Sequence, residues 1–424
     1  MNRRLYLAGL VGEIMEWYDF TVYGFFAVVI ASQFFPSEDP FVSMLSALAA
    51  FAVGFLMRPI GALVFGPMGD LFGRRRVLTT AVFLMAFPSL IIGLLPTYAS
   101  IGVLAPTMLV LMRMLQGMSV GGEHTGCVVY LSEQGSSRHR ALTAAVPFIG
   151  TVLGVLLGSL VGVSIYALFD AATVAAWAWR IPFLLGVLIA LVGLMVRRHL
   201  PESFRAADDA ARPSLFSQLL NNHWRAFLQV FFLNIVFASG FYTVFIYNPM
   251  WLQHFVGESK DLTLQINSLA LAMAILGIVI SALLADRVGR KPLLYVSTIG
   301  ITLMSYPIYA LMLHEFPLYV LLGQLSFGLL IGLFMGVVGS VMVELFSAEV
   351  RSSAVSISFN LCFALFGGTA PMLATWLVHT TGNPLNVAWV LSAGALASLI
   401  TVVTLPETRG RDTRLLDARG GTPG

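Results

Sequence analysis

The chain has 424 residues, of which 58% are hydrophobic and only 11% are charged. Soluble proteins carry about a quarter charged residues, so this composition excludes a soluble globular protein and predicts one that lipid partly covers. The net charge of +3 is concentrated in particular loops, and both cysteines, Cys127 and Cys362, fall inside apolar segments. Neither feature indicates a nucleic-acid partner or a disulfide-built domain.

Twelve apolar segments are long enough to cross about 30 Å of hydrocarbon. They lie near 8–31, 42–66, 77–95, 101–130, 141–168, 181–198, 226–253, 264–285, 292–313, 317–345, 353–379 and 385–405. The first contains three acidic residues and no small-residue cleavage site follows it, so it is expected to be a transmembrane helix and not a cleaved signal. The predicted fold is an all-α membrane protein with twelve transmembrane helices in two six-helix bundles.

The longest hydrophilic stretch lies at the midpoint of the chain and predicts its division. We expect an N-terminal bundle over 1–198, a cytoplasmic linker over 199–224, a C-terminal bundle over 225–406 and a cytoplasmic tail over 407–424. Basic residues gather in the loops on one side of the spans, whereas the opposite loops hold mostly acids. By the positive-inside rule both termini are expected in the cytoplasm, with the chain crossing a bacterial inner membrane several times.

Two patterns recur in the same order in the two halves. The loops at 66–76 and 282–292 each place an acid, then a glycine three residues on, then adjacent basic residues. Further on, Glu133 precedes Arg140 by seven residues, and Glu344 precedes Arg351 by seven. These correspondences indicate a duplicated half, with the two copies related by an axis along the membrane normal.

The repeated acids and arginines are candidates for a gate on the cytoplasmic face. Pairs between them would hold that face shut in one state and break in the other; alternatively, the arginines only satisfy the positive-inside rule. The candidate gating residues are Asp70, Arg74, Glu133, Arg140, Asp286, Arg287, Arg290, Glu344 and Arg351.

Four motifs carry a resemblance to a known family. They are GEIMEWYDFTVYG (12–24), FLMRPIGALVFG (55–66), RMLQGMSVGGEHTG (113–126) and WAWRIPF (177–183). Together with the repeated loops they resemble the major facilitator superfamily, and within it the metabolite:proton symporters that import citrate, 2-oxoglutarate, shikimate, or proline and betaine. Three positions depart from that pattern: Leu71 replaces an arginine, Glu13 a small or amide residue, and His124 a tyrosine.

Acidic groups within the spans are candidates for proton binding, because ionisable residues at membrane depth are costly and mark functional paths. Glu16, Asp19 and Tyr23 follow i, i+3, i+7 spacing on the first span. Two carboxylates one turn apart cannot both stay charged cheaply, so one is expected to hold a proton unless arginines pair with both. Glu123 could release protons toward the cytoplasm, and His124 is either a proton relay or a packing residue.

Arginines within the spans are candidates for substrate binding. Arg113 lies mid-span with Gln116 as its i+3 neighbour, and its guanidinium fits either a substrate carboxylate or a fixed acidic partner. Arg58 either closes the central site or bridges helices. The candidate substrate-binding residues are Tyr23, Arg58, Arg113, Gln116, Tyr242, Asn248 and Asn360.

The predicted function is proton-coupled import of a small organic acid or zwitterion by alternating access. The expected partners are this solute, protons and membrane lipid, with no nucleic acid and a monomeric chain. No enzyme activity, cofactor or metal is expected, because the chain has no Walker-type loop and its histidines lack metal-ligand spacing. The alternatives are a proton-coupled exporter of the same fold and a membrane binding protein that transports nothing.

Overall fold

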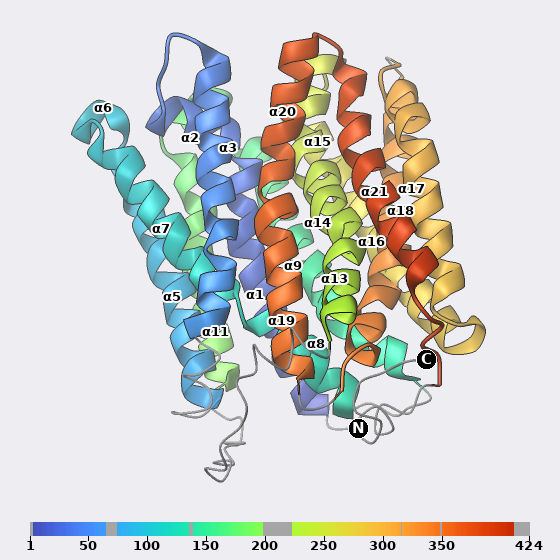
Figure 1. Cartoon of the computed structure of the whole chain (residues 1–424). Helices are drawn as coiled ribbons and strands as arrows, with labels where there is room; N and C mark the ends of the chain where they lie inside the picture. The colour runs from blue at the N-terminus through green and yellow to red at the C-terminus, as the bar shows by residue number, and fades with distance from the viewer. Residues whose placement is uncertain are drawn as a thin grey trace.

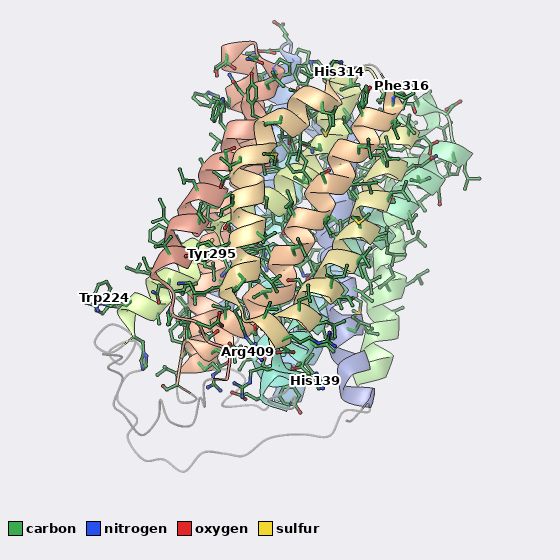
Figure 2. All side chains as sticks on the ribbon, turned by 90° about the vertical axis from the view of Figure 1, so that its right-hand side faces the viewer. His139, Trp224, Tyr295, His314, Phe316 and Arg409 are labelled. Atoms are coloured by element: carbon green, nitrogen blue, oxygen red, sulfur yellow. The ribbon has the colours of Figure 1, made fainter. Side chains whose placement is uncertain are left out.

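The computed structural model describes residues 3–64, 74–134, 139–197, 223–314, 316–347 and 350–410. Every regular element within these ranges is helical, and the helices stand side by side in one elongated bundle (Figure 1). His139, Trp224 and Arg409 lie toward one end of the bundle, and His314 and Phe316 at the other (Figure 2). We call these the lower and the upper end, as the figures are oriented.

The first half of the chain supplies the first six predicted spans. The first span is bent by 63° between α1 and α2, and the fourth is interrupted between α7 and α8. The helices are α1 (Arg3–Phe25), α2 (Ala27–Phe34), α3 (Pro40–Leu56), α5 (Arg74–Leu94), α6 (Tyr98–Ile101), α7 (Leu104–Val120), α8 (Glu123–Gln134), α9 (Arg140–Leu168), α10 (Ala171–Ala176), η2 (Ala178–Arg180) and α11 (Ile181–Arg197).

The second half supplies the other six spans, and short π-helical turns interrupt two of them at η3, η4 and η5. The helices are α13 (Trp224–Leu233), α14 (Ile235–Tyr242), η3 (Thr243–Tyr247), α15 (Asn248–Trp251), η4 (Leu252–Val256), α16 (Lys260–Val288), α17 (Lys291–Met312), α18 (Pro317–Glu344), α19 (Arg351–Cys362), η5 (Phe363–Gly367), α20 (Thr369–Thr381), η6 (Pro384–Asn386) and α21 (Val387–Thr404).

Eight helices of the described ranges are long and apolar enough to cross a membrane without a break, and the bent α1–α2 pair makes a ninth. Two further predicted spans contain shorter apolar helices, Thr80–Leu94 and Ala178–Leu191. The remaining one is divided between α7 and α8 and carries Arg113 and Glu123. Polar residues therefore weaken the apolar signal of the span in which the sequence places substrate and proton chemistry.

Glycines allow α3 and α7 to cross in backbone contact beside Arg113. A Cβ atom on Gly117 would lie 1.7 Å from the carbonyl oxygen of Gly54, and one on Gly121 would lie 2.1 Å from that of Arg58. Only glycine permits such an approach, since a side chain would push the helices apart. The crossing fixes the position of Arg113 relative to the aromatic residues of α3.

The two halves touch at both ends of the bundle. Near the upper end, the hydroxyl of Ser268 on α16 donates to that of Ser159 on α9 at 2.9 Å, and the rings of Phe41 and His379 stack with centroids 3.7 Å apart. At the lower end, ion pairs join the halves, as described below. Because both ends are bridged, the structure represents a closed state of the two halves.

The described loops keep the charge asymmetry seen in the sequence, with Arg140, Arg287, Arg290, Lys291, Arg351 and Arg409 at lower-end helix boundaries. This asymmetry is the basis for expecting the lower end in the cytoplasm, and the orientation remains a prediction. The residue bounds of the two bundles, the linker and the tail also remain a prediction, because residues 198–222 and 411–424 lie outside the described ranges.

Candidate functional site

A chain of hydrogen bonds joins Arg113 to Asp19 through two neutral side chains. Arg113 Nη1 donates to Gln116 Oε1 at 2.8 Å, and Gln116 Nε2 donates to Ser89 Oγ at 2.8 Å. Ser89 Oγ in turn donates to Asp19 Oδ2 at 2.9 Å. The structure thus brings Asp19, Arg113 and Gln116 together from α1 and α7, and Ser89 of α5 completes the connection.

Arg113 is fully buried among aromatic rings. Its Cζ atom lies 4.4 Å from the ring centroid of Phe20, 4.6 Å from that of Tyr23 and 5.3 Å from that of Phe51. Its Nε and Nη2 atoms have no hydrogen-bond partner among the described residues, and neither does Asp19 Oδ1. A buried guanidinium with unused donors is costly alone and is well suited to a carboxylate.

The carboxylate of Asp19 fits beside the sixth span because that helix has a glycine at this point. A Cβ atom on Gly186 of α11 would lie only 2.0 Å from Asp19 Oδ1. No ion pair joins Asp19 to an arginine among the described residues; Arg113 reaches it only through the neutral chain. The alternative in which Arg113 is a direct partner of this carboxylate is therefore not the arrangement seen.

Arg58 occupies a second aromatic environment, toward the lower end. Its Cζ atom lies 5.2 to 5.7 Å from the ring centroids of Trp17, Phe55 and Phe363. Because Phe363 belongs to η5 of the second half, Arg58 lies at the contact between the halves. Its Nε and Nη2 atoms lack hydrogen-bond partners among the described residues.

The other candidate proton-binding residues lie below Asp19. Glu16 is buried one turn before Asp19 on α1. Glu123 begins α8 directly after the break in the fourth span and is partly buried. His124 is buried, and its Nδ1 atom lies 2.7 Å from Oε2 of Glu13, an acid of the first span that departs from the family pattern.

The candidate substrate-binding residues of the second half fall in three different places. Tyr242 packs edge-on to Phe55 at 4.8 Å, close to both arginines. Asn248 belongs to a separate network, where it donates to Gln324 at 3.0 Å and accepts from Tyr309 at 2.5 Å. Asn360 donates to the carbonyl oxygen of Gly121 at the break between α7 and α8. Only Tyr242 therefore shares the aromatic surroundings of Arg113.

At the lower end, two ion pairs join the halves, and in each an acid of one copy of the repeat meets the arginine of the other copy. We call them the exchanged pairs. Glu133 of the first half pairs with Arg351 of the second at 2.7 Å. Conversely, Arg140 of the first half pairs with Glu344 of the second at 3.8 Å. Each copy of the repeat therefore contacts the opposite copy through matching residues.

A second-half cluster supports these exchanged pairs. Arg290 donates to Glu344 at 2.9 and 3.2 Å and pairs with Asp286 at 3.2 Å. Asp286 also accepts the backbone N–H of Ala141 at 3.2 Å, which reaches across to the first half. Arg287 is exposed. The corresponding first-half loop lies outside the described residues at Asp70, as does the side chain of Arg74.

Glu407 anchors the segment after α21 to the same end of the bundle. Partial burial tends to raise its pKa, but backbone hydrogen bonds from Arg290, Arg409, Lys291 and Thr408 outweigh this effect and lower the pKa below its ordinary value. Glu407 is therefore ionised at neutral pH and caps the start of α17 beside the Arg290 cluster.

The exchanged pairs predict a charge-swap rescue. Glu133→Arg should reduce uptake at least tenfold, because it places two arginines in contact and hinders closure of the lower end. Adding Arg351→Glu restores the pair in reverse and should recover at least half of the wild-type rate. Initial uptake rates, normalised to the amount of protein in the membrane, measure both effects. If the double variant is as slow as the single one, the pair does not contribute to closure.

Comparisons with known proteins agree with this geometry. The profile of the family described as "Sugar (and other) transporter" matches residues 5–212 and 205–418. The proline/betaine transporter of Escherichia coli (strain K12) is 33% identical over 436 residues, which cover 99% of this chain and 86% of that protein. The chain belongs to the major facilitator superfamily. The family resemblance drawn from the sequence motifs is thereby confirmed.

A further relative supports membership of the superfamily, and a solved structure shows the same fold. A glycine betaine/proline/ectoine/pipecolic acid transporter of Dickeya dadantii (strain 3937) is 33% identical over 99% of this chain and 85% of its own length. A crystal structure of a D-xylose–proton symporter superposes with a TM-score of 0.78 at 22% identity, covering 96% of this chain and 99% of that one. The predicted twelve-helix, two-bundle fold is confirmed, and the protein is a membrane transporter and not an enzyme.

In this superfamily member, sequence reasoning missed two groups at the site. Ser89 had no signal beyond being a hydroxyl within an apolar span, although it is the direct partner of Asp19. Glu13 and His124 were each noted as unusual, but their 111-residue separation hid their contact. A search for unusual residues that occur together in one chain could have found the Glu13–His124 pair.

Proposed function

We propose that the chain imports a small zwitterion, a compound with a carboxylate and a secondary or quaternary ammonium group, together with protons. The observation that carries the proposal is the buried Arg113, which has two unused donors and a neutral hydrogen-bonded connection to Asp19. The named substrates of the 33%-identical relatives, proline and betaine, favour a zwitterion over a di- or tricarboxylate.

The surroundings of Arg113 suit both ends of such a molecule. Its Nε and Nη2 donors would bind the substrate carboxylate in a fork. The ammonium group would lie against aromatic faces of Tyr23, Phe51 and Tyr242, which attract cations through their quadrupoles. In the structure the Arg113 guanidinium itself lies against the rings of Tyr23 and Phe51. The substrate carboxylate would draw Arg113 away from these rings and leave their faces to the ammonium group.

The connecting chain provides a route for coupling substrate to proton. Because Arg113 donates to the Gln116 oxygen, the Gln116 amide must present its N–H to Ser89, and the Ser89 hydroxyl can then donate to an ionised Asp19. The positive charge of Arg113 thereby stabilises the negative charge of Asp19, although the two groups are not in direct contact. When a substrate carboxylate neutralises Arg113, that support weakens and Asp19 more readily takes a proton.

Ser89 can serve both protonation states without moving. Its hydroxyl also lies 3.0 Å from the carbonyl oxygen of Met85. With Asp19 ionised, the hydroxyl donates to the carboxylate; with Asp19 protonated, it donates to Met85 and accepts from the new acid O–H. Proton binding therefore needs only a change of hydrogen-bond direction, which suits a group that is loaded and unloaded in every cycle.

The remaining steps follow from closure at the two ends. Substrate and proton would enter with the upper end open, and both would leave to the cytoplasm when the lower ion pairs separate. One proton moved down a potential of 100 mV supplies about 2.3 kcal/mol, or an accumulation of about fifty-fold.

Uptake by purified protein in liposomes tests the proposal. We expect labelled proline or glycine betaine to accumulate when the outside is acidic and the inside negative, and a protonophore to abolish that accumulation. Citrate, 2-oxoglutarate and shikimate serve as contrasting solutes. Accumulation of these acids alone would refute the zwitterion. Loss of preloaded zwitterion against its gradient, driven by inward proton flow, would establish export instead.

A further inference from the structure

Glu13 and His124 form a buried carboxylate–imidazole pair below the Arg113–Asp19 chain. Glu13 Oε2 lies 2.7 Å from His124 Nδ1, and the same oxygen accepts from Trp17 Nε1 at 3.2 Å and from the hydroxyl of Thr151 at 3.4 Å. Both members of the pair are at most 1% exposed. The pair joins α1 to α8, and Thr151 of α9 holds it from a third side.

This geometry determines which imidazole nitrogen is available to a proton. Two other donors already contact Glu13 Oε2, so an ionised Glu13 would accept a third hydrogen bond there from an Nδ1–H of His124. The remaining nitrogen, Nε2, has no hydrogen-bond partner among the described residues. A carboxylate on Nδ1 fixes the tautomer and stabilises the imidazolium, so Nε2 becomes the site at which a proton is bound.

Other titratable and charged groups surround the pair. Glu16 lies one turn after Glu13 on α1, and Glu123 and Cys127 flank His124 on α8, with Cys127 close to both carboxylates of α1. Arg58 lies over the ring of Trp17, 5.7 Å from its centroid. From α9 and α19 the neighbours are neutral rings, Phe148 and Phe359. Apart from Arg58 and the Cys127 thiol, the ionisable groups around the pair are carboxylic acids.

The pair is positioned to sense separation of the halves. The His124 ring stacks on Phe359 of α19 with centroids 5.1 Å apart, and Trp17 packs on Phe241 and Tyr242 of α14. These aromatic residues of the second half cover the pair. If the lower end opens, they move away and water reaches Nε2. While the lower end is closed, an ionised Glu13 beside a protonated His124 carries no net charge. Such a pair costs less free energy to bury than a lone carboxylate.

We propose that Glu13 and His124 form the proton-release site of the transporter. A proton from Asp19 passes to Glu16, one turn below it on α1 at a rise of about 4.5 Å per three residues, and from there to His124 Nε2. When the lower end opens, the imidazolium gives this proton to water and returns to the neutral tautomer. Glu13 is a positioning residue: it keeps its own charge and holds the imidazole. This inference rests on the proposed proton-coupled import.

Two transport assays on the same liposomes test the release site. His124→Gln should slow proton-driven net uptake at least tenfold and leave exchange of internal for external substrate within about twofold, because exchange needs no net proton release. Glu13→Gln should also slow net uptake, because the imidazole loses the carboxylate that positions it, whereas Glu13→Asp should retain most of the rate. His254→Gln, at an exposed histidine of η4, is the matched control and should change neither assay. Equal loss of net uptake and exchange, or wild-type net uptake in His124→Gln, would overturn the proposal.

A spectroscopic measurement separates this inference from the proposed function. In protein labelled with 15N-histidine, the signals missing from His124→Gln belong to His124. They should show hydrogen on Nδ1 and titration at Nε2, and in Glu13→Gln the hydrogen should no longer be fixed on Nδ1. This result requires no knowledge of the substrate. Absence of titration refutes the release site, whereas titration in a protein that accumulates no zwitterion refutes only the proposed function.

Discussion

Asp19→Asn is expected to abolish proton-driven accumulation while substrate exchange continues. Asparagine keeps the size of the side chain and can still accept the hydrogen bond from Ser89, so the connection to Arg113 stays assembled. It cannot bind and release a proton, so the roughly fifty-fold gain from 100 mV should fall to equilibration. The measurement is the steady-state ratio of internal to external substrate, together with counterflow in the same liposomes.

A second carboxylate provides the control for this variant. Asp170 caps α10 outside the spans, and hydrogen bonds from the backbone N–H and the hydroxyl of Thr173 lower its pKa below the ordinary value. It is therefore ionised throughout the neutral range, and Asp170→Asn should leave accumulation unchanged. If Asp19→Asn still accumulates substrate as the wild type does, the coupling proton binds elsewhere and the assignment is wrong.

Arg113→Lys is expected to reduce the efficiency of uptake by about a hundredfold, although it preserves the charge. Lysine lacks the planar fork, so it cannot donate to Gln116 and to a substrate carboxylate at the same time with good geometry. A loss of one or two charge-assisted hydrogen bonds gives an effect of this size. The dependence of initial uptake rate on substrate concentration should show it, mainly as weaker apparent affinity.

Arg225→Lys is the matched control, because Arg225 is exposed at the start of α13, away from the aromatic surroundings of Arg113. It should transport with wild-type affinity. If Arg113→Lys did so as well, the guanidinium would be a structural cation and the carboxylate of the substrate would bind another group. Arg58, with two unused donors at the contact between the halves, would then be tested next.

The fold was predictable because lipid imposes a strong and simple pattern on the sequence. Spans of about twenty apolar residues and their alternating charged loops define the helices before any packing is considered. The repeated loops also indicate a duplication, which remains an inference from the sequence. Local π-helical turns such as η3 were not predictable, because they depend on how a helix packs against its neighbours.

The site was predictable only where its residues share one helix. The spacing of Arg113 and Gln116 gave their contact, since i and i+3 residues lie on the same face. Which side chain of another span completes the connection depends on helix rotation, which hydropathy does not report. Ser89 and the Glu13–His124 pair belong to that class. Asn248 illustrates the opposite case: its position suggested a ligand role, but Gln324 and Tyr309 already engage its amide.

The partner exchange between Glu133, Arg140, Glu344 and Arg351 has a consequence for the origin of the protein. If both halves were identical, as just after a duplication, the acid of each half would pair with the arginine of the other, which gives two equivalent ion pairs. Two separate copies of a half-length chain could therefore have associated through the same residues, with the rotational symmetry of a homodimer. The complementarity that closes the lower end did not need to evolve after the copies were fused; a self-associating ancestor would already have contained it.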